Sequence, residues 1–157
     1  MKHRDGCCGA ISLSMSKNKQ GIICAGNWIV DIIQFIDRWP KEGELAPITE
    51  EMLSLGGCSA NVSIDLIKLD PTFPVLPISC IGNDEYGELI LETCAKYQLP
   101  THCFHRIPNE RTAHTQVINT RQSGQRTFFH YKGASSLLDN DHVPLESLEF
   151  QKYKHIH

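Results

Sequence analysis

Apolar and polar positions alternate along the chain in blocks that predict short strands and two helices. Ile22–Ala25 and Val75–Ile81 are apolar without alternation, which is typical of strands covered on both faces. Ile29–Ile36 is a third β-rich run, and it carries one charge, Asp31. Residues 153–157 resemble the start of another core strand, so we expect the chain to be truncated at its C-terminus.

Helical periodicity follows the glycine pair Gly56 and Gly57. The helix is predicted to end at Asp70, because the residue before a proline is steered away from the α region. Apolar residues fall on two adjoining faces, which predicts a mostly buried helix: Ala60, Ile64, Ile67, Val62, Leu66 and Leu69. A second helix is predicted to begin at Asp84, a candidate N-cap.

The remaining segments predict loops and one hairpin. Residues 39–47 read as a polar loop that continues through 48–55, so that the glycine pair follows a long loop and not a strand. Residues 112–119 alternate and are followed by a turn and by the β-rich run Arg126–Tyr131. This pattern predicts a β-hairpin.

The glycine pair is a candidate ligand-binding turn. Glycine lets the backbone approach a ligand closely, and the first N–H groups of the following helix are free to bind oxygen atoms. Asn61 lies in the first helical turn, where its amide can face the same space. The alternative is a tight turn that only leads into a core helix.

Asp31 is a candidate ligand because a carboxylate within an apolar run needs polar partners or a cavity. The alternative is that Asp31 lies on a solvated strand face. The sequence alone leaves both readings open.

Three motifs resemble the N-terminal half of the ribokinase-like (PfkB-type) carbohydrate kinases. They are Gly26-x-x-x-x-Asp31, Gly56-Gly57-x-x-Ala60-Asn61 and Gly82-x-Asp84-x-x-Gly87. In that family the glycine pair, the asparagine and the first aspartate contact sugar hydroxyls, whereas we interpret the third motif as a structural strand–turn–helix joint. Ile29 stands where ribose-type members often have asparagine, so ribose specificity is not carried over.

The resemblance implies a three-layer α/β/α core, of which residues 21–157 form the incomplete N-terminal half, with a small β-sheet lid. The hairpin is similar to the lid strands, and Phe129 is the aromatic residue that we expect to contact the sugar. The alternative is a hairpin packed on its own domain. The lid strands also have edges through which a homodimer can pair.

The implied activity of the full-length form is ATP-dependent phosphoryl transfer to a sugar hydroxyl, with Mg²⁺. The family's second signature, Asp-Thr-x-Gly-Ala-Gly-Asp, is absent here. We therefore assign no catalytic residue, and we expect this chain to lack the ATP-binding segment and to be inactive alone. The alternative is a non-catalytic half-domain that binds sugar or pairs with another subunit. A Rossmann-type domain ranks lower, because no Gly-x-Gly-x-x-Gly occurs.

Composition and charge limit the classes of binding partner that we expect for this chain. The 157 residues have a net charge of −3 and no apolar run long enough to cross a bilayer, so neither nucleic acid nor a membrane is expected as partner.

Seven cysteines without a Cys-x-x-Cys indicate a reducing, cytoplasmic setting, and Cys24, Cys58, Cys80 and Cys94 are predicted to be small buried hydrophobic residues. The run 102–105 contains two histidines and a cysteine, but no second cluster to complete a metal site. Residues 1–20 read as a disordered tail.

Overall fold

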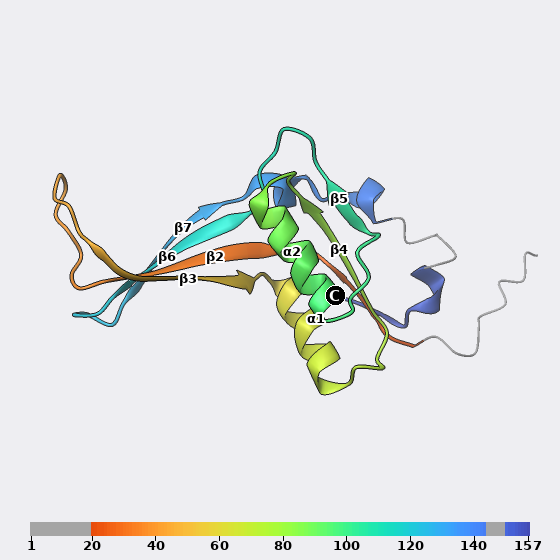
Figure 1. Cartoon of the computed structure of the whole chain (residues 1–157). Helices are drawn as coiled ribbons and strands as arrows, with labels where there is room; N and C mark the ends of the chain where they lie inside the picture. The colour runs from red at the N-terminus through yellow and green to blue at the C-terminus, as the bar shows by residue number, and fades with distance from the viewer. Residues whose placement is uncertain (1–19, 144–149) are drawn as a thin grey trace, which may run out of the picture.

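The structure is a computed structural model that describes residues 20–143 and 150–157 (Figure 1). One sheet of four parallel strands has the order β5-β4-β1-β8. Its strands are β1 (Ile22–Ala25), β4 (Val75–Ile81), β5 (Phe104–Arg106) and β8 (His155–Ile156). The predicted strand at the end of the chain is confirmed by β8, whereas β5 was not predicted because three residues show no readable period.

Both faces of this sheet are covered, as the unbroken apolar runs predicted. Successive residues of β1 point to opposite sides, so Ile23 and Cys24 belong to different apolar clusters. Cys24 packs with residues of helices α1 (Cys58–Leu69) and α2 (Glu85–Lys96). Ile23 packs with Leu76, Ile78 and Phe150. The covered faces explain why all seven residues of β4 are buried.

The second sheet, which we call the lid sheet, has the order β3-β2-β6-β7 and projects away from the two helices (Figure 1). It comprises β2 (Ile29–Ile36), β3 (Ile48–Gly56), β6 (His114–Thr120) and β7 (Arg126–Tyr131). β2 pairs antiparallel with β3 and parallel with β6, and β6 forms the predicted hairpin with β7.

The prediction that a loop precedes the glycine pair is wrong, because β3 reaches Gly56. β3 is an edge strand whose first seven residues are exposed. Backbone hydrogen bonds to β2, and not burial, hold it in place. A strand of this kind leaves little apolar pattern in the sequence.

Helix α1 is less buried than predicted. Only Ser59, Ala60, Ser63 and Ile64 are buried in it, and Leu69 is 82% exposed. Cys58 is also exposed, contrary to its prediction as a buried hydrophobe. Val62 and Leu66 of the second apolar face are only partly buried against the core, and Leu69 lies at the surface.

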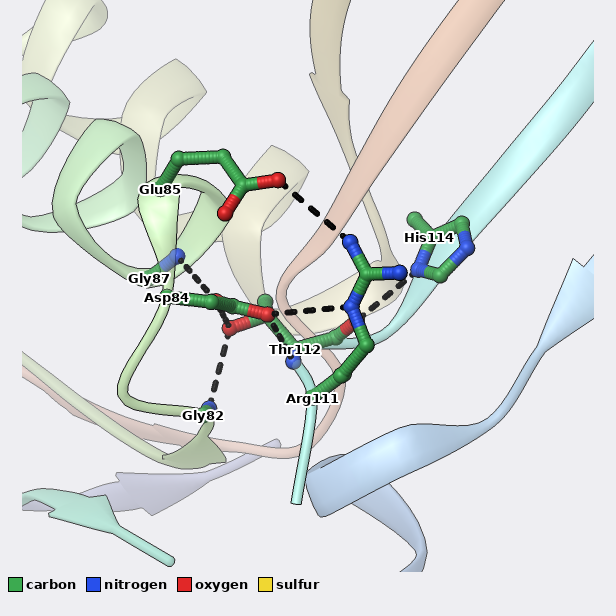
Figure 2. A network of polar contacts seen from close by, with 7 residues as sticks. All are labelled: Gly82, Asp84, Glu85, Gly87, Arg111, Thr112 and His114. Carbon is green, nitrogen blue, oxygen red and sulfur yellow. Dashed lines mark hydrogen bonds and ion pairs between the residues drawn. The ribbon is translucent and has the colours of Figure 1, made fainter. Parts of the chain in front are cut away.

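The third motif forms a closed polar joint between β4 and α2 (Figure 2). The carboxylate of Asp84 accepts hydrogen bonds from the backbone N–H of Gly87 (3.0 Å), the backbone N–H of Thr112 (2.9 Å) and the Thr112 hydroxyl (2.6 Å). The Thr112 hydroxyl accepts in turn from the backbone N–H of Gly82 (2.9 Å).

Burial raises the pKa of Asp84, but the hydrogen bonds from Thr112 and Gly87 and the charge of Arg111 outweigh it, so that the pKa lies below its usual value. Arg111 Nε lies 3.8 Å from the carboxylate (Figure 2). The geometry agrees with the structural reading of this motif: Asp84 caps α2 and ties it to the start of the hairpin.

Candidate functional site

Asp31 lies on β2 at the base of the lid sheet, in a row of polar side chains that crosses all four strands. Asp31 pairs with Ser54 on β3 and with Thr115 on β6, and Thr115 pairs with His130 on β7. Directly paired residues of neighbouring strands point to the same face of a sheet. The row therefore collects one carboxylate, two hydroxyls and one imidazole on a single face.

The Asp31 carboxylate is half-buried with few partners. Burial raises its pKa above the usual value, and a hydrogen bond from Thr115 and the charge of His130 oppose this only in part. Thr115 and His130 are joined by a hydrogen bond of 3.0 Å between Oγ1 and Nδ1. The Thr115 hydroxyl thus links the Asp31 carboxylate to the His130 imidazole.

Gly56 lies against Asp31 and Gly57 lies against Asn27, and neither position leaves room for a side chain. A Cβ on Gly56 would overlap the Asp31 carboxylate, and a Cβ on Gly57 would overlap the carbonyl of Asn27. Gly57 has φ of +98° and is the N-cap of α1. Glycine tolerates this conformation, whereas other residues are strained in it.

The N-terminus of α1 opens toward this corner without a side-chain cap or an acidic residue in its first turn. Such an end offers N–H groups and a positive dipole to oxygen ligands. Its position is fixed by a buried chain of hydrogen bonds. The indole N–H of Trp28 donates to the Ser59 hydroxyl (3.1 Å), which donates to the carbonyl of Cys24 on β1 (2.7 Å).

Asn61 lies one turn into α1 and lines a cleft of about 310 Å³ between β3, α1 and α2. Ser54, the neighbour of Asp31 in the polar row, lines the same cleft. Asp31 itself does not line it. The structure thus brings Gly56 and Gly57 to Asp31, whereas Asn61 approaches the row from the side of β3.

Phe129 lies on the other face of the lid sheet. It pairs with Gln116, one position out of step with the Thr115–His130 pair. Its ring stacks at 6.4 Å and 15° on Trp39, and 53% of the residue is exposed. The structure therefore does not bring Phe129 to Asp31, and the aromatic residue of the hairpin on the Asp31 face is Phe128.

Thr115 and His130 are neighbours of Asp31 in the candidate site that the sequence did not predict. Thr115 lies within the alternating run 112–119, but its neighbour across the sheet is set by the parallel pairing of β2 with β6. These strands are separated by two helices and three other strands in the sequence. Strand alternation gives the face within a hairpin, but not the register against a distant strand.

The histidines of the 102–105 run do not form a metal centre with described residues. His105 Nε2 donates to the carbonyl of His142 at 3.1 Å. Within residues 20–143 and 150–157 there is no group of three or more His, Cys, Asp or Glu side chains arranged to hold a metal ion. No helix in the same residues is long and apolar enough to cross a membrane.

Comparison with known proteins agrees with the motifs. The profile of the pfkB family carbohydrate kinases matches residues 19–157. A ribokinase from Mus musculus is 22% identical over 120 residues, which are 76% of this chain and 36% of that protein.

Solved structures show the same fold. Ribokinase from Thermotoga maritima has a TM-score of 0.65 and 25% identity, over 73% of this chain and 37% of its own. Ribokinase from Arabidopsis thaliana, solved with ribose and ATP, has a TM-score of 0.66 and 27% identity, over 73% of this chain and 36% of its own.

The chain thus spans little more than a third of the length of these relatives. Its few helices and two sheets correspond to an incomplete ribokinase-like α/β core with its lid. The family profile covers nearly all of the sequence. The chain therefore belongs to the pfkB family of carbohydrate kinases.

Proposed function

We propose that this chain forms the sugar-binding half of an ATP-dependent sugar kinase. The observation that carries the proposal is the half-buried Asp31 carboxylate beside Gly56, Gly57 and the uncapped end of α1. A carboxylate with few protein partners accepts hydrogen bonds from substrate hydroxyls. Asn61 is the further sugar contact, reached through the cleft beside β3.

The described residues bind and orient the acceptor sugar. Asp31 accepts from two neighbouring hydroxyls, and the backbone N–H groups at the start of α1 donate to a sugar oxygen. Thr115 holds the carboxylate by a hydrogen bond, and His130 holds Thr115. Phosphoryl transfer depends largely on such positioning, because the acceptor hydroxyl must lie in line with the transferred group.

ATP supplies the phosphoryl group in the proposed reaction, and Mg²⁺ accompanies it. The described residues do not form a metal cluster, so we assign them no role toward Mg²⁺. We also assign no catalytic base to this chain. We propose that a longer protein carries these elements, that it works in the cytoplasm on small sugars or polyols, and that this chain is inactive alone.

The direct test is ATP-dependent phosphorylation of a panel of sugars by the full-length protein that carries this sequence. We expect phosphorylation of at least one sugar, and a loss of sugar affinity of at least about 100-fold in Asp31→Ala. Asp37→Ala, at the exposed turn after β2, is the matched control and should keep the affinity. Unchanged affinity in Asp31→Ala would rule out this site.

A second proposal is a homodimer through the lid sheet, with or without catalysis. It is favoured by large apolar side chains on the lid that are about half exposed: Ile48, Met52, Leu53, Phe128 and Phe129. β3 and β7 also have open edges. Light scattering at increasing concentration should show a dimer that Phe128→Asp weakens. A monomer at all concentrations would contradict the proposal.

A further inference from the structure

A small polar cavity lies beside His130, where β7 leads into the 3-10 helix η1 (Gly133–Leu137). Its volume is about 120 Å³, and it is lined by Asn27, His130, Lys132, Ser135 and Ser136. All five lining side chains are polar, and the lining includes no carboxylate. A cavity with this lining suits an anionic group.

Two of the lining groups lack partners in the described part of the chain. The Ser135 hydroxyl oxygen is buried and has no hydrogen-bond partner among these residues. A buried hydroxyl without a partner loses about 1–3 kcal/mol relative to water, so it marks a place where a ligand atom is expected. Residues 20–143 and 150–157 also hold no carboxylate within ion-pair distance of Lys132.

The cavity wall is held in place by the backbone. Gly133 has φ of +47°, and a Cβ there would overlap the carbonyl of Arg111. The N–H of Ala134 donates to that same carbonyl at 2.8 Å. Gly133 and Ala134 are buried, so the segment that carries Lys132 and Ser135 is packed tightly against the start of the hairpin.

The cavity adjoins the candidate sugar site through two residues. His130 lines the cavity and is hydrogen-bonded to Thr115, the partner of Asp31. Asn27 also lines it, and the Asn27 carbonyl lies against Gly57. A sugar held by Asp31 and the glycine pair therefore has one end directed toward Lys132 and Ser135.

We propose that the acceptor sugar carries an anionic group, a carboxylate or a phosphate, which binds in this cavity. The proposal rests on the function proposed above. Lys132 supplies the charge, and Ser135 and the Asn27 amide supply hydrogen-bond donors. About 120 Å³ equals the liquid volume of roughly four waters, which is room for a four- or five-atom anion but not for a whole hexose.

The test measures kcat and KM of the full-length protein with ATP and four acceptors: D-gluconate, D-fructose 6-phosphate, D-fructose and D-ribose. We expect an anionic acceptor to be preferred. Preference for gluconate identifies a carboxylate, and preference for fructose 6-phosphate identifies a phosphate. In Lys132→Met and Ser135→Ala, KM for the preferred anion should rise about 10- to 100-fold, with little change in KM for neutral sugars.

Two control variants make the outcomes distinct. Lys132→Arg should restore most of the affinity, whereas Lys41→Met, on an exposed loop, should have no effect. If neutral sugars are phosphorylated and anionic ones are not, or if Lys132→Met weakens both alike, the anion proposal is overturned while the kinase proposal stands. If no sugar of either class is phosphorylated, the kinase proposal itself fails.

Discussion

Asp31 and Asp84 belong to two glycine-containing motifs of one chain, and their surroundings differ in the number of donors. Asp84 accepts three hydrogen bonds from Gly87 and Thr112. Asp31 receives one, from Thr115, although it too is partly buried. The pKa of Asp84 is therefore lowered, whereas that of Asp31 is raised.

We propose that this contrast separates a structural carboxylate from a binding carboxylate. The acceptor sites of Asp84 are occupied by the protein, so its contribution is to hold α2 on the hairpin. The carboxylate oxygens of Asp31 can accept further hydrogen bonds where the lid sheet meets Gly56 and the start of α1. Burying this charge with few donors lowers folding stability. Perturbed, under-satisfied groups of this kind gather at functional sites.

Replacing Asp31 with asparagine should have the largest effect on binding. In the full-length protein we expect sugar affinity to fall about 100-fold, equivalent to ~2.7 kcal/mol, because an amide cannot accept from two hydroxyls as a carboxylate does. Isothermal titration with the preferred sugar measures it. The same substitution at Asp84 is the matched control, and a larger affinity loss there would reverse our assignment.

Asp84→Asn should instead lower stability. The new amide group presents N–H donors to the donors of Thr112 or Gly87, so we expect the free energy of unfolding to fall by about 2 kcal/mol. Urea denaturation measures the change. Asp31→Asn should not lower stability, since it removes a carboxylate that is costly to bury. An equal loss in the free energy of unfolding in both variants would contradict the proposed difference between Asp31 and Asp84.

Gly56→Ala should weaken sugar binding by displacing Asp31. The backbone of Gly56 is not in the left-handed region, so the new methyl group acts only through its overlap with the Asp31 carboxylate. We expect about a 10-fold loss of affinity, or ~1.4 kcal/mol. In an Asp31→Ala background the added methyl should change little. An equal loss in both backgrounds would show that Gly56 acts independently of Asp31.

The two carboxylates should also respond to pH with opposite signs. The pKa of Asp84 is lowered by folding, so its contribution to stability is present above the unfolded value near 3.8 and is lost as pH falls through the lower folded value. The pKa of Asp31 is raised, so the cost of burying its charge is relieved as pH falls through that raised value.

Comparing the wild type with each asparagine variant by urea denaturation between pH 3 and pH 7 separates these effects. The stability advantage of Asp31→Asn should shrink on acidification, and so should the stability deficit of Asp84→Asn, but the former at higher pH. The expected changes are about 0.5–1 kcal/mol. Shrinkage in the reverse order would contradict the assigned pKa directions.

The sequence predicted what local pattern determines. Asp84 was recognised as an N-cap, and the apolar run of β4 was recognised as a strand covered on both faces. Strand β3 was missed, because backbone pairing with β2 holds it without burial. The Asp31 motif was found, but its partners Thr115 and His130 depend on the register between β2 and β6, which no local pattern contains. The same limit hid that Phe129 lies on the face of the lid sheet opposite Asp31.

We expect Asp31 to bind the sugar as an ionised carboxylate and Asp84 not to contact it. Carboxyl ¹³C NMR titration of the full-length protein, with and without the sugar that it phosphorylates, tests this directly. Sugar hydroxyls stabilise the ionised form, so we predict that the pKa of Asp31 falls on binding and that of Asp84 does not change. An unchanged pKa of Asp31, or a shift at Asp84 in its place, would contradict the claim.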